Sequence, residues 1–285
     1  MKLAGKRAVI TGASQGLGLS IAELFASQGA DLLICSRNST DLKAAQQQIS
    51  AHGKGRVLAQ TADVSLESDV KDLADIAASQ LGGVDILVCN AGVYGPKGSI
   101  DELPWDEWVR AININLIGTV LCCRSFLSLL RDSPRGKIIL LSGGGATKPL
   151  PFLSAYAASK AAVVRFGETL AEELRSASID VNSVAPGALN TRLLQEVLDA
   201  GPEKVGQAFY EASLKQSATG GTPLETGSAL CLYLASDESN GITGKLISAV
   251  WDPWQSFQNH GDDLAKTDVF TLRRIVPSER GLSWG

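Results

Sequence analysis

A tyrosine and a lysine that can act in acid–base chemistry lie four residues apart in the stretch Ser154-Ala-Tyr-Ala-Ala-Ser-Lys160. The composition around them favours a helix, and residues four apart on a helix project from the same face. A nearby ammonium favours the ionised phenolate and thereby lowers the pKa of the phenol. The pair Tyr156 and Lys160 therefore predicts a group that exchanges protons near neutral pH.

A glycine-rich turn, Thr11-Gly-Ala-Ser-Gln-Gly-Leu-Gly18, lies close to the start of the chain. Such a turn lets the backbone approach a pyrophosphate at the N-terminus of a helix. A lone match is weak, because glycines also end helices and form tight turns. Here the turn follows a predicted strand and opens a predicted helix, which is the context that the match requires. Together with the Tyr156/Lys160 pair, it predicts a redox enzyme that uses a dinucleotide.

Strand and helix signals alternate along the chain at the spacing of βαβ units. The expected strands are 7–11, 31–35, 56–60, 84–89, 137–141, 179–184 and 245–248. The expected helices are 17–28, 39–52, 66–81, a long stretch from Pro104 through Asn115 to about 131, and 154–176. Right-handed crossovers make this an α/β fold, a doubly wound parallel (Rossmann) sheet of about seven strands with helices on both faces.

The chain divides into one nucleotide-binding domain over 1–249 and a C-terminal extension over 250–285. Within the domain, the segment 187–221 is long, irregular and mixed in composition, which is typical of a substrate lid. In the extension, Trp251, Trp254 and Phe257 are expected to pack in the core or at a subunit contact rather than to recognise substrate. Arg273 and Arg274 are expected to be solvated surface charges.

Composition excludes several classes of function. The net charge of −4 without a basic stripe argues against nucleic acid as a partner. Five cysteines without CxxC spacing are expected to be small core residues in a reducing compartment, and two histidines make a histidine-rich metal site unexpected. The start of the chain has no apolar signal segment, and no apolar stretch approaches the roughly 18–20 residues of a membrane span. We expect a cytoplasmic protein with no membrane partner and no metal.

The ordered motifs resemble those of the classical short-chain dehydrogenase/reductase family, over about residues 3–249. In chain order, they are the glycine turn from Thr11 to Gly18, Asp63-Val64, Asn90-Ala-Gly92, Asn115-Leu-x-Gly118, Tyr156-x3-Lys160, and Pro186-Gly187 with Thr191. Six motifs in this order are very specific for the family. They say little about the substrate.

The resemblance implies roles for individual positions. Asp63 and Val64 would border the adenine, while Asn115 would hold a water that links Lys160 to solvent. Tyr156 would be the acid–base group. The residues implied in cofactor binding are Gly12, Ser14, Gln15, Gly16, Leu17, Gly18, Ser36, Arg37, Asn38, Asp63, Val64, Asn90, Ala91, Gly92, Tyr156, Lys160, Pro186, Gly187 and Thr191.

The end of the second strand bears on the choice of cofactor. An acidic residue there accepts a hydrogen bond from the ribose 2′-hydroxyl and selects NAD, whereas a nearby arginine accommodates the 2′-phosphate of NADP. The sequence is Cys35-Ser36-Arg37-Asn38, in which Ser36 takes the place of the acid. A solvated loop arginine is the plain alternative, but a planar guanidinium suits phosphate and stacks on adenine. We predict a preference for NADP(H).

One position departs from the family pattern. Most members have a serine thirteen residues before the tyrosine that hydrogen-bonds the substrate carbonyl, and in this chain that position is Gly143. Ser142 lies one residue earlier and would be re-aimed by a twist or bulge in the glycine run. Alternatively, backbone N–H groups of 143–145 would polarise the carbonyl, or catalysis has been lost. Ser142 is favoured slightly over the backbone groups as a fourth catalytic residue beside Asn115, Tyr156 and Lys160.

The sequence thus predicts an NADP(H)-dependent reduction of a carbonyl to an alcohol, or the reverse, with Tyr156 as acid or base. Two alternatives stay open: an NADP-binding sensor or scaffold without turnover, and an epimerase or dehydratase that uses NADP. The partner is expected to be a small carbonyl or alcohol molecule of unknown identity. Resemblance to the family also implies a homodimer or homotetramer.

Overall fold

Seven parallel strands form one sheet in the computed structural model, which describes residues 1–284. The strands are β1 (Arg7–Thr11), β2 (Asp31–Ser36), β3 (Val57–Thr61), β4 (Ile86–Cys89), β5 (Gly136–Leu141), β6 (Ile179–Ala185) and β7 (Lys245–Ser248). Their order, β3-β2-β1-β4-β5-β6-β7, confirms the predicted doubly wound sheet. The strand order reverses between β1 and β4, and a crevice opens there at the carboxyl ends of the strands.

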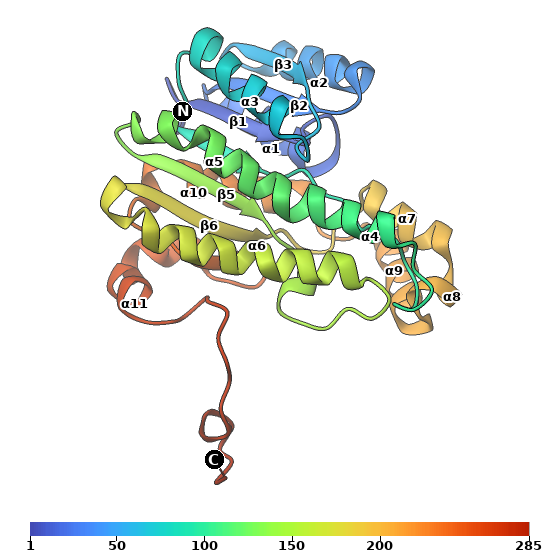
Figure 1. Ribbon diagram of the computed structural model, residues 1–285. Helices are drawn as coiled ribbons and strands as arrows, with labels where there is room; N and C mark the ends of the chain where they lie inside the picture. The colour runs from blue at the N-terminus through green and yellow to red at the C-terminus, as the bar shows by residue number, and fades with distance from the viewer. Residues whose placement is uncertain (285) are drawn as a thin grey trace.

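Helices cover both faces of the sheet, as Figure 1 shows with α5 and α6 in front of the strands and α1 and α10 behind them. Successive strand residues alternate between the two resulting cores. Ile10 lies in the core under one set of helices and Val9 in the core under the other. The first set comprises α1 (Gly16–Ser27), α2 (Ser39–His52) and α10 (Leu224–Ala235), and the second α3 (Glu67–Ile76), α5 (Gly118–Arg131) and α6 (Ser154–Glu173).

A wide helical turn interrupts the long helix that crosses the second face. Helix α4 (Trp105–Ile112) continues through a π-helical segment, Asn113–Ile117, directly into α5. The combined helix, Trp105–Arg131, has 27 residues and is long and apolar enough to cross a membrane by length and composition alone. The expectation that no apolar stretch reaches that length is therefore wrong. One such helix is a weak indication, because a helix in the core of a soluble protein passes the same test.

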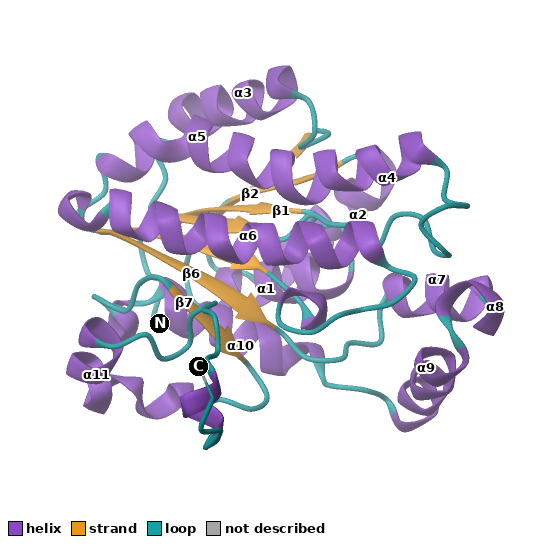
Figure 2. Ribbon diagram, turned by 60° about the horizontal axis from the view of Figure 1, so that its bottom comes forward, coloured by secondary structure: helices purple, strands orange, loops and turns teal. Residues whose placement is uncertain are grey.

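Three helices occupy the segment that was expected to be irregular. They are α7 (Arg192–Ala200), α8 (Pro202–Val205) and α9 (Gln207–Thr219). Figure 2 shows them grouped at one end of the molecule, on the side to which the arrowhead of β6 points. Gly201 and Gly206 separate them with φ angles of +74° and +82°, a left-handed backbone that glycine adopts readily.

The C-terminal extension packs along β7 before it leaves the body of the protein. Phe257 is buried, and its ring centre lies 5.1 Å from that of Phe270 at a tilt of 41°, whereas Trp251 is 85% exposed. The backbone N–H of Leu246 in β7 donates to the carbonyl of Phe270 at 2.8 Å, so the extension covers the sheet edge. Beyond Leu272 the chain extends away from the domain (Figure 1).

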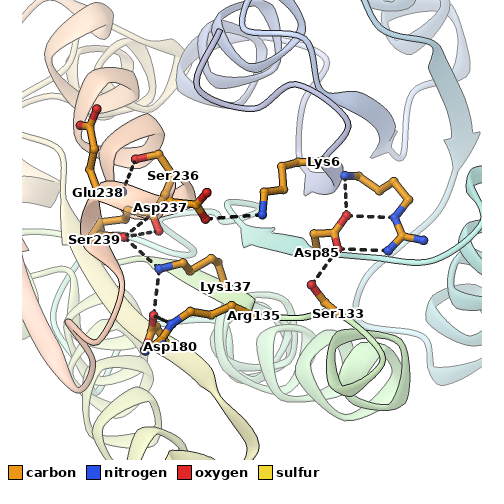
Figure 3. A network of polar contacts seen from close by, with 12 residues as sticks. Lys6, Asp85, Ser133, Arg135, Lys137, Asp180, Ser236, Asp237, Glu238 and Ser239 are labelled. Carbon is orange, nitrogen blue, oxygen red and sulfur yellow. Dashed lines mark hydrogen bonds and ion pairs between the residues drawn. The ribbon is translucent and has the colours of Figure 1, made fainter.

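A network of ion pairs joins the amino ends of the central strands, opposite the crevice (Figure 3). Asp180 at the start of β6 accepts from Lys137 at 2.8 Å and from Arg135 at 2.9 Å. Asp85, just before β4, accepts from Arg7 at 2.9 Å and from Ser133 at 2.7 Å. Because Lys137 and Asp180 are both buried, each needs the other as its partner. Ion pairs therefore connect the strands at this end of the sheet, whereas the crevice lies at the carboxyl end.

Candidate active site

A cavity of about 1230 Å³ lies over the carboxyl ends of the strands. Of the residues predicted to form the site, only Asn115 is absent from its lining. The glycine turn, the ends of β2, β4, β5 and β6, the start of α6 and helix α7 all contribute to the wall. The structure therefore brings the predicted cofactor residues and the Tyr156/Lys160 pair to one place.

The glycine turn has the shape that a pyrophosphate requires. Gly12 has a φ of +65°, and a Cβ on it would lie 2.8 Å from the Cα of Ala91. A Cβ on Gly18 would overlap the Gly12 carbonyl oxygen. Gln15 precedes α1 without a side-chain cap, so the N–H groups of the first helical turn remain available to an anion. These residues fit the pyrophosphate of a dinucleotide.

Asn90 fixes the wall beside the turn. Its side-chain N–H groups donate to the carbonyls of Thr11 at 2.9 Å and Gly12 at 3.0 Å, and its backbone N–H donates to the Thr11 hydroxyl at 3.0 Å. These bonds join the end of β1 to the end of β4. The Asn90 side chain is thus occupied in holding the glycine turn in place.

Arg37 follows β2, where the ribose that carries the 2′-hydroxyl of NAD or the 2′-phosphate of NADP would be recognised. Its guanidinium is 43% exposed and 4.0 Å from the Asp63 carboxylate. Burial raises the pKa of Asp63, but hydrogen bonds from Ser65 and the charge of Arg37 together lower it by more. The pKa of Asp63 therefore lies below the ordinary value. Asn38 caps α2 by accepting from two backbone N–H groups, and Ser36 donates to the Asn38 carbonyl. Arg37 is the only cation among these residues and is loosely held.

The lysine of the catalytic pair is enclosed beneath the tyrosine. The ammonium of Lys160 donates to the carbonyl of Leu141 at 2.8 Å and lies 5.8 Å from the centre of the Tyr156 ring. Burial lowers the pKa of Lys160 to about 8. Gly92 allows the close packing, because a Cβ there would lie 3.4 Å from the Lys160 ammonium.

The pKa of Tyr156 differs from the expectation that Lys160 lowers it. Burial raises the pKa of Tyr156 well above the ordinary value, and Tyr94 raises it further. The Lys160 ammonium donates to a backbone carbonyl and makes no hydrogen bond to the phenol, so burial determines the pKa of Tyr156 in the resting protein. Tyr156 therefore carries its proton at neutral pH, and release of that proton requires a nearby charge that stabilises the phenolate.

Asn115 is fully buried, and its side chain is fully engaged. Its amide oxygen accepts from the backbone N–H of Val93 at 2.8 Å, and its N–H₂ group donates to the Val93 carbonyl at 2.8 Å and to Ser159 at 3.0 Å. That Asn115 holds a water which links Lys160 to solvent stays a prediction. Asn115 joins the long helix to the loop that follows β4 and to the helix that bears Tyr156.

The geometry at the end of β5 bears on whether Ser142 can replace the serine that the family has at position 143. A Cβ on Gly143 would overlap the Tyr156 hydroxyl, so position 143 faces the tyrosine, as the family pattern implies. The Ser142 hydroxyl oxygen is enclosed and makes no hydrogen bond within residues 1–284. Ser142 still forms part of the cavity wall, so the choice between its hydroxyl and the backbone N–H groups of 143–145 stays a prediction.

Tyr94 is a site residue that the sequence reasoning missed. Its ring meets the ring of Tyr156 edge to face, with centroids 4.6 Å apart and an interplanar angle of 71°. It also lines the cavity, next to the glycines at 143–145. The feature of the sequence that could have identified Tyr94 is its position, two residues after the motif that ends at Gly92. Further residues on this side of the cavity are Thr147, Lys148, Leu150, Val197 and Phe209.

The five cysteines are all buried and free. Three of them, Cys89, Cys122 and Cys123, lie together in the core beneath α5. Among residues 1–284, no three side chains of histidine, cysteine, aspartate or glutamate gather in a way that would hold a metal ion.

Known proteins resemble this chain over most of its length. The family model described as short chain dehydrogenase matches residues 6–201. A 3beta-hydroxysteroid dehydrogenase 1 from Eggerthella lenta is 37% identical over 248 residues, which cover 86% of this chain and 92% of that protein. A D-beta-hydroxybutyrate dehydrogenase from Rhizobium meliloti is 31% identical over 249 residues, 85% of this chain and 96% of that protein.

Among solved structures, a short-chain type dehydrogenase/reductase from Mycobacterium marinum is 32% identical and superposes with a TM-score of 0.77. The match covers 87% of this chain and 94% of that one.

Proposed function

The chain belongs to the short chain dehydrogenase family, and we propose that it interconverts a carbonyl and an alcohol with NADP(H), using Tyr156 as the acid–base group. The observation that carries the proposal is the position of Tyr156 and Lys160 in the same cavity as the uncapped glycine turn. The family binds a nicotinamide cofactor, and relatives named for hydroxybutyrate and hydroxysteroid substrates support a small alcohol or ketone as the substrate.

In the reductive direction, Tyr156 gives its proton to the carbonyl oxygen. When bound, the nicotinamide supplies the hydride for the carbonyl carbon. The phenol is protonated at neutral pH, as a proton donor must be, while burial, which raises its pKa, makes it a weaker acid. Lys160 holds its charge beneath the phenol, where it stabilises the phenolate left after proton transfer. Asn115 connects the loop after β4 to α6 by hydrogen bonds, so that the phenol and the ammonium keep their positions.

The preference for NADP(H) rests on Arg37. No carboxylate occupies position 36, and the Arg37 guanidinium makes only a long contact of 4.0 Å with Asp63. A phosphate on the ribose would form charge-assisted hydrogen bonds with this guanidinium. Titration of NADPH and NADH by fluorescence tests it. Arg37→Gln should weaken NADPH binding by about tenfold or more and leave NADH unchanged. The control Arg124→Gln, on α5 and paired with Glu67, should change neither.

Turnover is tested by NADPH oxidation at 340 nm with a panel of sugars, ketoacyl thioesters, cyclic ketones and aromatic ketones. Loss of the rate in Tyr156→Phe, with NADPH binding retained, supports the reductase. Tight NADPH binding without oxidation would favour the sensor or scaffold. Product formation without stoichiometric NADPH consumption would favour an epimerase or dehydratase.

We also propose a homodimer or homotetramer. The long helix leaves an apolar surface open, with Trp105 66% and Ile117 41% exposed. A monomer in light scattering would contradict this.

The division into a domain over 1–249 and an extension over 250–285 is likewise proposed, as is a cytoplasmic location. The free cysteines support a reducing compartment, which cell fractionation can test.

A further inference from the structure

The substrate oxygen lacks one of its expected hydrogen-bond donors in this chain. In the proposed reaction, negative charge grows on this oxygen as hydride adds to the carbonyl carbon, until the proton of Tyr156 neutralises it, and a second donor beside Tyr156 stabilises that charge. Gly143 offers no side chain, and the Ser142 hydroxyl oxygen is enclosed at the end of β5. The backbone N–H groups of 143–145 are one source of a second donor, and a side chain of the cavity wall is another.

Tyr94 is the side chain placed to supply the second donor. It lines the cavity, and its ring packs edge to face on Tyr156 at 4.6 Å. Its hydroxyl makes no hydrogen bond within residues 1–284, and that oxygen is not among the enclosed polar atoms without a partner. The Tyr94 hydroxyl is therefore both free and accessible, in contrast to that of Ser142.

Two charged side chains, Lys97 and Glu196, lie close to Tyr94. The ammonium of Lys97 lies 5.7 Å from the centre of its ring and 3.5 Å from the Glu196 carboxylate on α7. Burial raises the pKa of Tyr94, and the charge of Glu196 raises it further, so the phenol keeps its proton. Tyr94 is thus fixed as a hydrogen-bond donor between the loop after β4 and the lid.

We propose that the Tyr94 hydroxyl donates a second hydrogen bond to the substrate oxygen that receives the proton of Tyr156. During reduction, the hydride forms the new C–H bond, the Tyr156 O–H bond breaks, and that proton forms the alcohol O–H. The Tyr94 O–H bond stays intact throughout. The inference rests on the proposed reductase function and adds a catalytic residue in place of the missing serine.

Tyr94→Phe tests the inference, because it removes the hydroxyl and keeps the ring against Tyr156. We expect kcat to fall by about 10²-fold, as for the loss of one donor to a developing oxyanion. The Kd for NADPH and the Tm should not change. Tyr210→Phe on α9, outside the cavity lining, is the matched control and should retain wild-type kcat.

The possible results separate the two proposals. A kcat of Tyr94→Phe within threefold of wild type overturns the role of Tyr94, while the reductase stands. A fall in kcat that is accompanied by weaker NADPH binding or a lower Tm shows a packing role and also overturns it. If the wild-type protein reduces no carbonyl of the panel while NADPH still binds, the proposed function fails and the role of Tyr94 fails with it.

Discussion

Gly143 and Tyr156 share one small space at the centre of the cavity. The Tyr156 hydroxyl lies where a Cβ on Gly143 would be, and Gly143 has an extended φ of −177° that any residue can adopt. A side chain at 143 would therefore displace the tip of the Tyr156 side chain without straining the backbone. The effect should be seen in the rate and not in the stability.

Gly143→Ala is expected to lower kcat by about tenfold or more, because small misplacements of reacting groups reduce rates strongly. The free energy of unfolding should change by less than about 1 kcal/mol, since the tip of the Tyr156 side chain can move aside. Steady-state kinetics and urea denaturation measure the two effects. An unchanged kcat would show that the phenol does not work from this position.

The pH profile of reduction should show the titration of Lys160. Burial lowers the pKa of this ammonium to about 8, so its charge is present below that pH and lost above it. Because the charge stabilises the phenolate formed on proton transfer, kcat/KM for NADPH should fall as the pH rises through about 8. A kcat/KM that stays constant from about pH 7 to pH 9.5 would contradict this role for Lys160.

Among the elements, the π-helical turn at Asn113–Ile117 has the most direct effect on the site. It directs Asn115 inward, where the amide pairs with both backbone groups of Val93. Asn115→Leu would leave these two groups without partners and should lower the free energy of unfolding by about 2–4 kcal/mol. Asn113→Leu, on the same turn but exposed, is the control and should have little effect. Equal stability of the two variants in urea denaturation would show that Asn115 does not join these elements.

The strands were the most predictable elements. Strands β1 and β7 were predicted with the observed bounds. In β1, the apolar residues are buried on both faces and form a continuous run, which marks a central strand. The lid helices α7, α8 and α9 were not predicted. Glycines at 201 and 206 break them into short pieces, and their apolar residues follow the wall of a cavity and not a continuous core.

Within the site, motif positions were predictable and their contacts were not. The spacing of Tyr156 and Lys160 indicates a shared helix face, but it gives no information about the carbonyl of Leu141 that binds the ammonium. Tyr94 was missed because its partner, Tyr156, is distant in the sequence. Burial and long-range contacts, which determine the pKa values, follow from the tertiary structure alone.

Over the whole molecule, the C-terminal extension acts as a cover for the edge of the sheet. The buried ammonium of Lys245 donates to the carbonyls of Thr267 at 3.1 Å and Val269 at 3.0 Å, and the N–H of Leu272 donates to Glu168 at 2.6 Å. Residues 273–284 lie beyond these contacts. The extension therefore has an anchored part and a projecting part.

Two truncations separate these parts. Ending the chain after Lys266 removes the partners of Lys245 and opens the β7 edge, so the Tm should fall by about 5–10 °C and self-association should increase. Ending it after Leu272 removes an exposed ion pair of Arg273 and should shift the Tm by no more than about 1–2 °C. Thermal denaturation with light scattering measures both. Equal Tm values for the two truncated proteins would contradict the anchoring role.

Transfer of deuterium from NADPH to an alcohol tests the central claim most directly. The protein is incubated with NADPH deuterated at C4 on the transferred side and with the ketone panel, and the products are analysed by mass spectrometry, with Tyr156→Phe as the control. We predict an alcohol that carries one deuterium at the carbinol carbon, absent with the variant. Bound NADPH that transfers no label to any ketone of the panel, or equal labelling by Tyr156→Phe, would contradict a reductase that uses Tyr156.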